Sequence, residues 1–400
     1  MRAEPPVAAP RAGRDIRLLF TLGGVATAAF LPFFVLLLSD RGLAADRIGF
    51  VLAIASLAGV VSVPFWSHVA DARLGGALTL QLTSFATATA ALALIPTGSN
   101  VWAIALMTSV LYVVSAPGTA LSDTIALRVL GPERETDYGR IRLWASAGWA
   151  VAVVLFGAWY EEAGLGPVLP AYALGTAVFA VVALRFPATR PERRTSAGSR
   201  WGSVGEAFRI SPRLLPFLVG LLLVSVATSA AWSFLPLRIV SRGGGPLLIG
   251  LSAAVGAVVE IPFFRASAWL GEHVSLRALY ASGVGIYVAM LVAWSVVSDP
   301  VAVASIKVAG GAGFGLTYAA LVVITGRLVP DRLRNTGQAL MQTFGAGIGP
   351  VVGAAIGGLV YQHLGAPTLF AGAAVGASLG AVVVWRALSE RERSPRAGLG

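Results

Sequence analysis

The feature that most constrains this chain is a run of about twenty apolar residues that recurs along nearly its whole length. A helix of about twenty residues crosses the hydrocarbon core of a bilayer, which is about 30 Å thick. Charged residues make up only 12% of the 400 residues, whereas soluble domains have about 25%. The runs therefore predict an all-α integral membrane protein, with lipid as the solvent for most of its surface.

Charged residues, glycine and proline divide the apolar runs into twelve predicted transmembrane helices. We expect two six-helix bundles at residues 16–186 and 214–388. A cytoplasmic N-terminal tail (1–15), a cytoplasmic linker (187–213) and a cytoplasmic C-terminal tail (389–400) complete the predicted organisation. The predicted spans lie near 16–38, 48–69, 77–95, 101–121, 143–160, 166–186, 214–237, 247–270, 276–297, 301–328, 336–361 and 366–388.

Arginine is distributed unequally between the two sets of loops that twelve alternating spans create. Loops rich in Lys and Arg stay in the cytoplasm, and one set has only four arginines, Arg41, Arg47, Arg238 and Arg242. This predicts a multi-pass protein of the inner (plasma) membrane with both termini cytoplasmic. The net charge of +11 belongs to these loops, with no basic face on which aromatic residues could stack bases, so the expected partner is lipid and not nucleic acid.

Short sequence segments recur in the same order about half a chain apart, which indicates an internal duplication. Pro64-Phe65 returns as Pro262-Phe263, 198 residues later, and Pro132-Glu133-Arg134 returns as Pro330-Asp331-Arg332, also 198 residues later. Tyr160 and Gly164 return as Tyr361 and Gly365, 201 residues later. A parallel repeat of six helices resembles the architecture of the major facilitator superfamily, which implies a transporter.

The loop from Ser67 to Gly75, SHVADARLG, resembles the superfamily's G-x-L-A-D-R-x-G-R motif in part. Asp71 falls on the acidic position of the motif, whereas Ser67 and Ala72 replace its first glycine and an arginine. The resemblance implies that Asp71 and Arg73 are gating residues, because a carboxylate there can pair with arginines in one conformation and release them in another. The alternative is a solvated loop acid.

The segment from Tyr138 to Trp149, YGRIRLWASAGW, resembles an element of the lactose permease type of sugar:proton symporters and, more closely, the phenylpropionate-permease group. The resemblance implies that Arg142 binds substrate and that Trp149 stacks on a ring. We expect Asp123 to orient Arg142, and Arg140 to act in gating. Alternatively, both arginines are positive-inside anchors and Asp123 is a helix-end carboxylate or pairs with Arg128.

Glu260 and Lys307 lie inside apolar spans of the second half. A charge at mid-bilayer costs roughly 2.5–3.5 kcal/mol even on lenient scales, so such residues are functional candidates. Lys307 matches the helix 10 lysine of lactose-permease-like proteins, but Gly310 and Gly313 replace the His and Glu that follow it there. We therefore expect Glu260, helped by Lys307, to couple transport to protons. The alternatives are a permanent structural ion pair, or Lys307 extending to the exterior face.

Five further polar or aromatic residues are weaker candidates for the substrate site, and each is also explained by packing or interhelical hydrogen bonding. The glycine-rich segment from Gly310 to Gly315 predicts close helix packing or a bend instead of a phosphate-binding loop, because no strand precedes it. The five candidates are Tyr112, Trp232, Tyr318, Gln338 and Gln342.

The residue types disfavour an enzyme. His68, His273 and His363 fall near different membrane surfaces and the chain has no cysteine, so we expect neither a metal site nor a cofactor. The predicted function is proton-coupled symport of a small organic solute, with an aromatic carboxylate or similar organic anion favoured because Arg142 and Lys307 supply two cations. The alternatives are a sugar or nucleoside symporter, drug or metabolite efflux, and a membrane sensor or scaffold. We expect a monomer.

Overall fold

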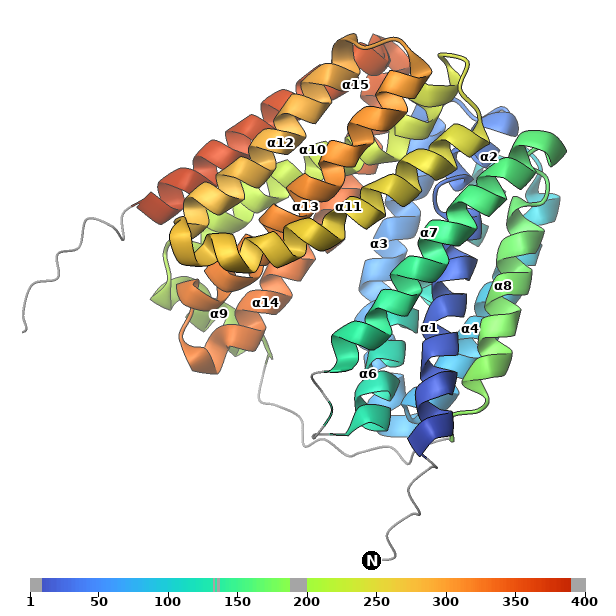
Figure 1. The fold of residues 1–400 in the computed structure, drawn as a ribbon, viewed down its shortest axis with the longest axis horizontal. Helices are drawn as coiled ribbons and strands as arrows, with labels where there is room; N and C mark the ends of the chain where they lie inside the picture. Colours follow the sequence, from blue (N-terminus) through green and yellow to red (C-terminus); the bar gives the residue numbers. More distant parts are fainter. Residues whose placement is uncertain (1–8, 132–133, 135–136, 188–199, 390–400) are drawn as a thin grey trace, which may run out of the picture. The chain divides into compact units, whose positions relative to one another are not determined.

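A computed structural model describes residues 9–131, 134, 137–187 and 200–389. Within these residues the chain is helical and has no strand (Figure 1). Helices are expected in lipid because they satisfy every backbone polar group internally. The helices are α1 (Ala9–Phe30), α2 (Phe34–Asp40), α3 (Ala45–Val69), α4 (Gly76–Ala93), α5 (Val101–Ser115), α6 (Gly118–Leu130), α7 (Tyr138–Ala163), α8 (Val168–Ala183), α9 (Arg200–Ile210), α10 (Leu214–Val240), α11 (Pro246–His273), α12 (Leu276–Val296), α13 (Pro300–Leu328), α14 (Arg334–Gln342) and α15 (Gly349–Ser389).

Ten helical segments of the described chain are long and apolar enough to cross a membrane. The predicted span at 166–186 corresponds to the shorter apolar helix α8, and the last two predicted spans fall in one continuous segment, Asp331–Leu388. Gly365 breaks that segment, because its φ of 82° is not helical and is readily adopted only by glycine. The count of twelve crossings therefore stays a prediction, although each predicted span overlaps a helix.

Parts of the predicted organisation lie outside the described residues. These are most of the N-terminal tail, the repeat words at Pro132 and Glu133, the linker from 188 to 199, and the C-terminal tail from 390. The rest of the predicted linker contains a helix, α9, which the sequence analysis did not predict. Glu206 of α9 forms an ion pair of 2.7 Å with Arg332, which lies just before α14.

The described chain separates into two compact units. Within the described residues, unit 1 comprises 9–43, 54–187 and 245–254, and unit 2 comprises 44–53, 200–244 and 255–389. In unit 1, α1 packs on α7 and α8, and α4 packs on α8 (Figure 1). In unit 2, α10 packs on α15, while α12 packs on α13 and α15.

Helices α3 and α11 each begin in one unit and end in the other, and their first residues pack in equivalent ways. In unit 1, a Cβ on Gly157 of α7 would lie 2.8 Å from the carbonyl oxygen of Pro246. In unit 2, a Cβ on Gly358 of α15 would lie 2.6 Å from the carbonyl oxygen of Ala45. Gly358 follows Gly157 by 201 residues, and Pro246 follows Ala45 by 201 residues. The internal repeat is therefore visible both in short recurring sequence segments and in equivalent backbone contacts that only glycine permits.

Large apolar side chains remain exposed on many helices. Trp102 is 74% exposed, Val61 67% and Leu174 67%. So much exposed apolar surface is unusual in a soluble monomer, and lipid is the solvent that covers it without cost.

Candidate functional site

The Asp123 cluster consists of Asp123 on α6 and Tyr138 and Arg142 on α7, all in unit 1. Arg142 Nη1 donates to both carboxylate oxygens of Asp123, at 3.1 and 3.2 Å. The same nitrogen lies 3.1 Å from the Tyr138 hydroxyl, one helical turn earlier. The pair is partly exposed, since the Arg142 side chain is 53% exposed and that of Asp123 28%. The expected contact of Asp123 with Arg142 is present, and Tyr138 is an addition that the sequence analysis missed.

Trp149 follows Arg142 by seven residues on α7, which places both on one face of the helix, about 10 Å apart along its axis. Trp149 is half-buried, and its backbone lies 3.0 Å from where a Cβ on Gly24 of α1 would be. Tyr112 of α5 is half-buried and packs against Gly59 of α3. Neither contact assigns these two residues to a substrate site, and that role stays a prediction.

The Glu260 cluster consists of Trp232 on α10, Glu260 on α11, Tyr287 on α12 and Lys307 on α13, all in unit 2. Helices α11 and α13 are in close contact. A Cβ on Gly311 of α13 would collide with the carbonyl oxygen of Gly256 of α11, so only glycine allows this approach. The close packing expected of the glycine-rich segment is thus present. The same Cβ would lie 3.2 Å from the backbone nitrogen of Glu260, so this packing brings Glu260 against the helix that carries Lys307. Glu260 interacts electrostatically with Lys307 and Tyr287.

Lys307 contacts an aromatic ring in place of a carboxylate. Its Nζ lies 5.6 Å from the centroid of the Trp232 ring, a cation–π distance, whereas no ion pair within 4.0 Å joins it to Glu260. Gly310 leaves room for this ring, because a Cβ there would lie 3.3 Å from Trp232 Cζ2. Trp232 Nε1 is buried and has no hydrogen-bond partner among the described residues. Such a donor is costly unless another state or a ligand satisfies it.

The two glutamines bond to α13. Gln338 Nε2 donates to the Val322 carbonyl at 2.9 Å, and Gln342 Nε2 donates to the Tyr318 hydroxyl at 3.4 Å. The Tyr318 ring stacks on Phe314, with 5.4 Å between centroids. These contacts are the interhelical hydrogen bonds that the sequence analysis gave as the alternative to a substrate role.

Comparison with known proteins identifies the family. The sequence profile of the MFS_1 like family matches residues 17–371. The chain is a member of this family. It is therefore a membrane transporter of the major facilitator type and not an enzyme.

Relatives and solved structures support this assignment. The transporter is 27% identical over 393 residues to the maltose permease of Geobacillus stearothermophilus, covering 94% of each chain. Its fold resembles a mutant form of the nucleoside transporter NupG, with a TM-score of 0.84 at 16% identity over 94% of this chain and 100% of that one. It also resembles a bacterial homolog of the human lysosomal transporter Spinster, with a TM-score of 0.68 at 14% identity over 96% and 98% of the two chains.

The predicted gating residues of the transporter are exposed. Asp71 and Arg73 lie on a short π-helical segment, Ala70–Leu74, that follows α3. Arg140, whose side chain is 87% exposed, lies 3.6 Å from Asp137. Gating by these residues stays a prediction. Among the described residues, no three His, Cys, Asp or Glu side chains are grouped so as to hold a metal ion.

Two of the four arginines in the loops that were predicted to be arginine-poor have structural partners. Arg41 Nη1 donates to the Leu94 carbonyl at the end of α4, at 3.0 Å, and Arg238 Nη2 donates to the Val297 carbonyl at the end of α12, at 2.9 Å. Cations are favoured at helix C-termini, where carbonyl groups lack helical partners. Burial lowers the pKa of Arg41, and neighbouring Asp40 opposes this shift. These arginines cap helices, a role that the loop count alone did not reveal.

Proposed function

We propose that the transporter couples proton movement to the import of a neutral, hydroxyl-rich solute, a sugar or a nucleoside, by alternating access. The single observation that carries this proposal is that the cation of each cluster has a carboxylate nearby. Arg142 is bonded to Asp123, and Lys307 interacts electrostatically with Glu260. Neither cluster therefore offers the uncompensated positive charge that would favour an anion.

An arginine–carboxylate pair suits a sugar chemically. The guanidinium donates and the carboxylate accepts, so adjacent hydroxyl groups find both kinds of partner. Trp149, on the same face of α7, offers an indole for a sugar or base ring. Two similar proteins are a maltose permease and a nucleoside transporter, which supports this substrate class.

Proton coupling is assigned to Glu260. A membrane-embedded carboxylate next to a lysine that is held over an indole ring can gain and lose a proton without breaking a direct ion pair. The proposal also includes twelve crossings, both termini on the cytoplasmic side of the inner membrane, and a monomeric protein. The arginine-rich loops support that orientation.

The aromatic carboxylate, favoured from the sequence because Arg142 and Lys307 supply two cations, is the competing substrate class, and Asp123→Asn separates the two. The change leaves the charge of Arg142 uncompensated, so it should tighten binding of an anion and weaken binding of a sugar or nucleoside by about tenfold, the value of one charge-assisted hydrogen bond. Thermal-shift binding of glycosides, nucleosides and aromatic carboxylates to purified protein measures this.

The expected result is a glycoside or nucleoside that stabilises the wild-type protein and stabilises the variant less. An aromatic carboxylate that binds alone, and binds more tightly to Asp123→Asn, would overturn the proposed substrate class. Arg134→Lys, a change in an exposed arginine paired with Asp137, is the control and should bind as the wild type does. Export of the solute from proteoliposomes, in place of its uptake, would favour the alternative that the protein is an efflux transporter.

A further inference from the structure

Tyr318 and Gln342, both in unit 2, form a polar contact well inside the apolar part of their helices. Tyr318 lies about 15 Å along the axis from the end of α13, and Gln342 lies about 12 Å from the start of α14. Tyr318 is 37% exposed and Gln342 is also exposed. An amide that faces hydrocarbon at this depth is costly, so the exposure of Gln342 favours a water-filled cavity over lipid on this face of unit 2.

The contact places an aromatic face beside an amide. The Tyr318 ring stacks on Phe314, with 5.4 Å between the ring centroids, and each ring is 37% exposed. Gln342 Nε2 donates to the Tyr318 hydroxyl at 3.4 Å, and the amide makes no other hydrogen bond among the described residues. Its second N–H and its carbonyl oxygen can therefore bind a solute. We call Phe314, Tyr318 and Gln342 the ring platform.

The ring platform has a counterpart in the Asp123 cluster of unit 1. The Tyr318–Gln342 contact joins α13 to α14, and in unit 1 the pair of Asp123 and Arg142 joins α6 to α7. At the repeat spacing of 201 residues Arg142 corresponds to Thr343, and at 198 residues Asp123 corresponds to a leucine. The same two helices of each repeat are thus bridged by a charged pair in unit 1 and by a neutral pair in unit 2.

The helix changes its winding directly after Gln342. Residues Thr343–Ile348 form a π-helical turn, a feature that is frequent at functional sites. In such a turn the carbonyl of Gly345 would bond to residue 350, but Pro350 has no N–H, and the hydroxyl of Ser225 on α10 donates to that carbonyl instead. Unit 1 has a glycine and a tryptophan at the positions 201 residues before Ser225 and Pro350, and its α7 is α-helical throughout. The wider turn helps to set the direction in which Gln342 projects.

We infer that the ring platform is a subsite that binds an uncharged ring of the transported solute. The ring stacks on Tyr318, and its hydroxyl groups or ring heteroatoms exchange hydrogen bonds with the Gln342 amide. The inference rests on the proposed function, because it takes the solute to be a sugar or a nucleoside. It adds a neutral contact in unit 2 to the charged contact proposed for unit 1.

Substitutions of Tyr318 separate stacking from a loss of fold. Tyr318→Leu removes the ring face and should weaken binding of a glycoside or nucleoside roughly three- to tenfold, whereas Tyr318→Phe keeps the face and should weaken it about twofold at most. Phe156→Leu, a change in another stacked aromatic pair, is the control and should bind as the wild type does. Equilibrium binding to purified protein measures all three. Wild-type affinity in Tyr318→Leu, or an equal loss in both Tyr318 variants, would overturn the inference.

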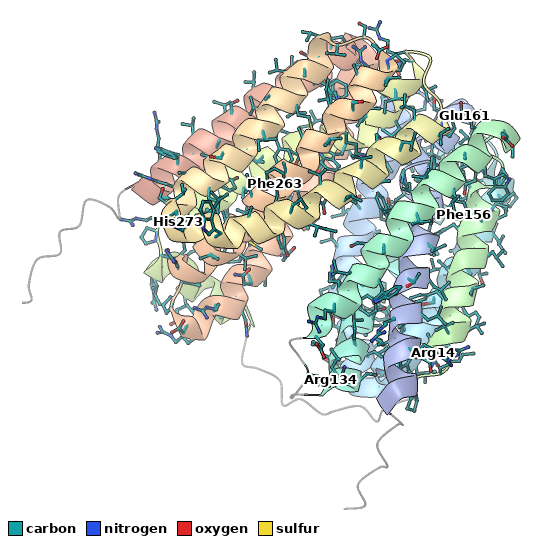
Figure 2. All side chains as sticks on the ribbon, viewed as in Figure 1. Arg14, Arg134, Phe156, Glu161, Phe263 and His273 are labelled. Atoms are coloured by element: carbon teal, nitrogen blue, oxygen red, sulfur yellow. The ribbon has the colours of Figure 1, made fainter. Side chains whose placement is uncertain are left out.

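Cysteine labelling tests the location of the subsite, because the chain has no cysteine of its own. A membrane-impermeant maleimide should label Gln342→Cys in lipid nanodiscs, and a bound glycoside or nucleoside should slow the labelling in a saturable way. Arg134→Cys is the control and should label at one rate with and without solute. Figure 2 labels both control residues, Arg134 and Phe156.

The outcomes distinguish this inference from the proposed function. If Gln342→Cys does not label, its face contacts lipid and the inference fails whatever the solute. A glycoside or nucleoside that stabilises the wild-type protein without protecting Gln342→Cys would overturn the inference and leave the proposed function standing. If no glycoside or nucleoside binds the wild-type protein, both fail.

Discussion

The Asp123 cluster and the Glu260 cluster contain the same kinds of charge but hold them differently. In the first, the guanidinium of Arg142 is 3.1 Å from its carboxylate and both groups are partly open to solvent. In the second, Lys307 lies over an indole ring at 5.6 Å and has no ion pair within 4.0 Å to Glu260. A direct, partly exposed pair suits recognition of hydroxyl groups, whereas a separated pair leaves the carboxylate available for protonation. This difference supports the proposal that unit 1 binds the substrate and that unit 2 couples transport to protons.

The largest effect is expected from Glu260→Gln, which tests whether the Glu260 cluster couples transport to protons. The amide cannot carry a proton through the cycle, so accumulation of substrate against its gradient should be abolished, and uptake should no longer rise as the external pH falls. Substrate exchange, which needs no net proton movement, should continue. Uptake into proteoliposomes under an imposed pH gradient measures both, with Glu162→Gln as the control. Wild-type accumulation in Glu260→Gln would disprove coupling through this residue.

A smaller effect is expected from Arg142→Lys, which tests the binding side. Lysine keeps the charge but loses the planar fork of donors. The affinity for substrate should fall by the value of one charge-assisted hydrogen bond, about 1.5–3 kcal/mol or roughly ten- to hundredfold in Kd. Equilibrium binding to purified protein measures it, and Arg134→Lys should bind normally. Loss of coupling with unchanged affinity would reverse the assignment of roles to the two clusters.

The smallest effect is expected from Trp232→Phe, which tests the cation–π contact between Lys307 and Trp232. Phenylalanine keeps an aromatic face but attracts a cation less strongly and lacks the buried, unpartnered Nε1–H. Uptake at limiting substrate should fall roughly two- to fivefold, the range of an ordinary cation–π contact. Trp102→Phe, a change at a tryptophan that is 74% exposed, should leave initial uptake rates unaltered. An equal loss in both variants would show that the effect does not come from the contact between Trp232 and Lys307.

Much of the candidate site could be anticipated from chemistry that is local in the sequence. Glu260 and Lys307 stand out because a charge inside an apolar span is costly anywhere in the chain. Arg142 and Asp123 stand out through a short motif and a helix-end acid. Tyr138 was missed as a third member, although it precedes Arg142 by four residues, the spacing of neighbours on a helix face.

Contacts between distant residues could not be anticipated in the same way. Nothing near Lys307 in the sequence indicates that Trp232, 75 residues earlier, lies beside it. The same holds for Arg41 and Arg238, whose carbonyl partners lie 53 and 59 residues further along the chain. The positive-inside rule gives the side on which an arginine falls, but not the helix end that it caps.

The sequence by itself determined the family, the helical nature of the chain and its duplication, because helix formation in lipid depends on apolar runs and the repeat is visible as spaced words. The tertiary structure decided which charges are paired, that two helices begin in one unit and end in the other, and that Ser225 bonds to the π-helical turn after Gln342. The physical reason is range: hydropathy and helix geometry act over one or two turns, whereas the partner of Ser225 lies 120 residues away and is brought to it only by packing.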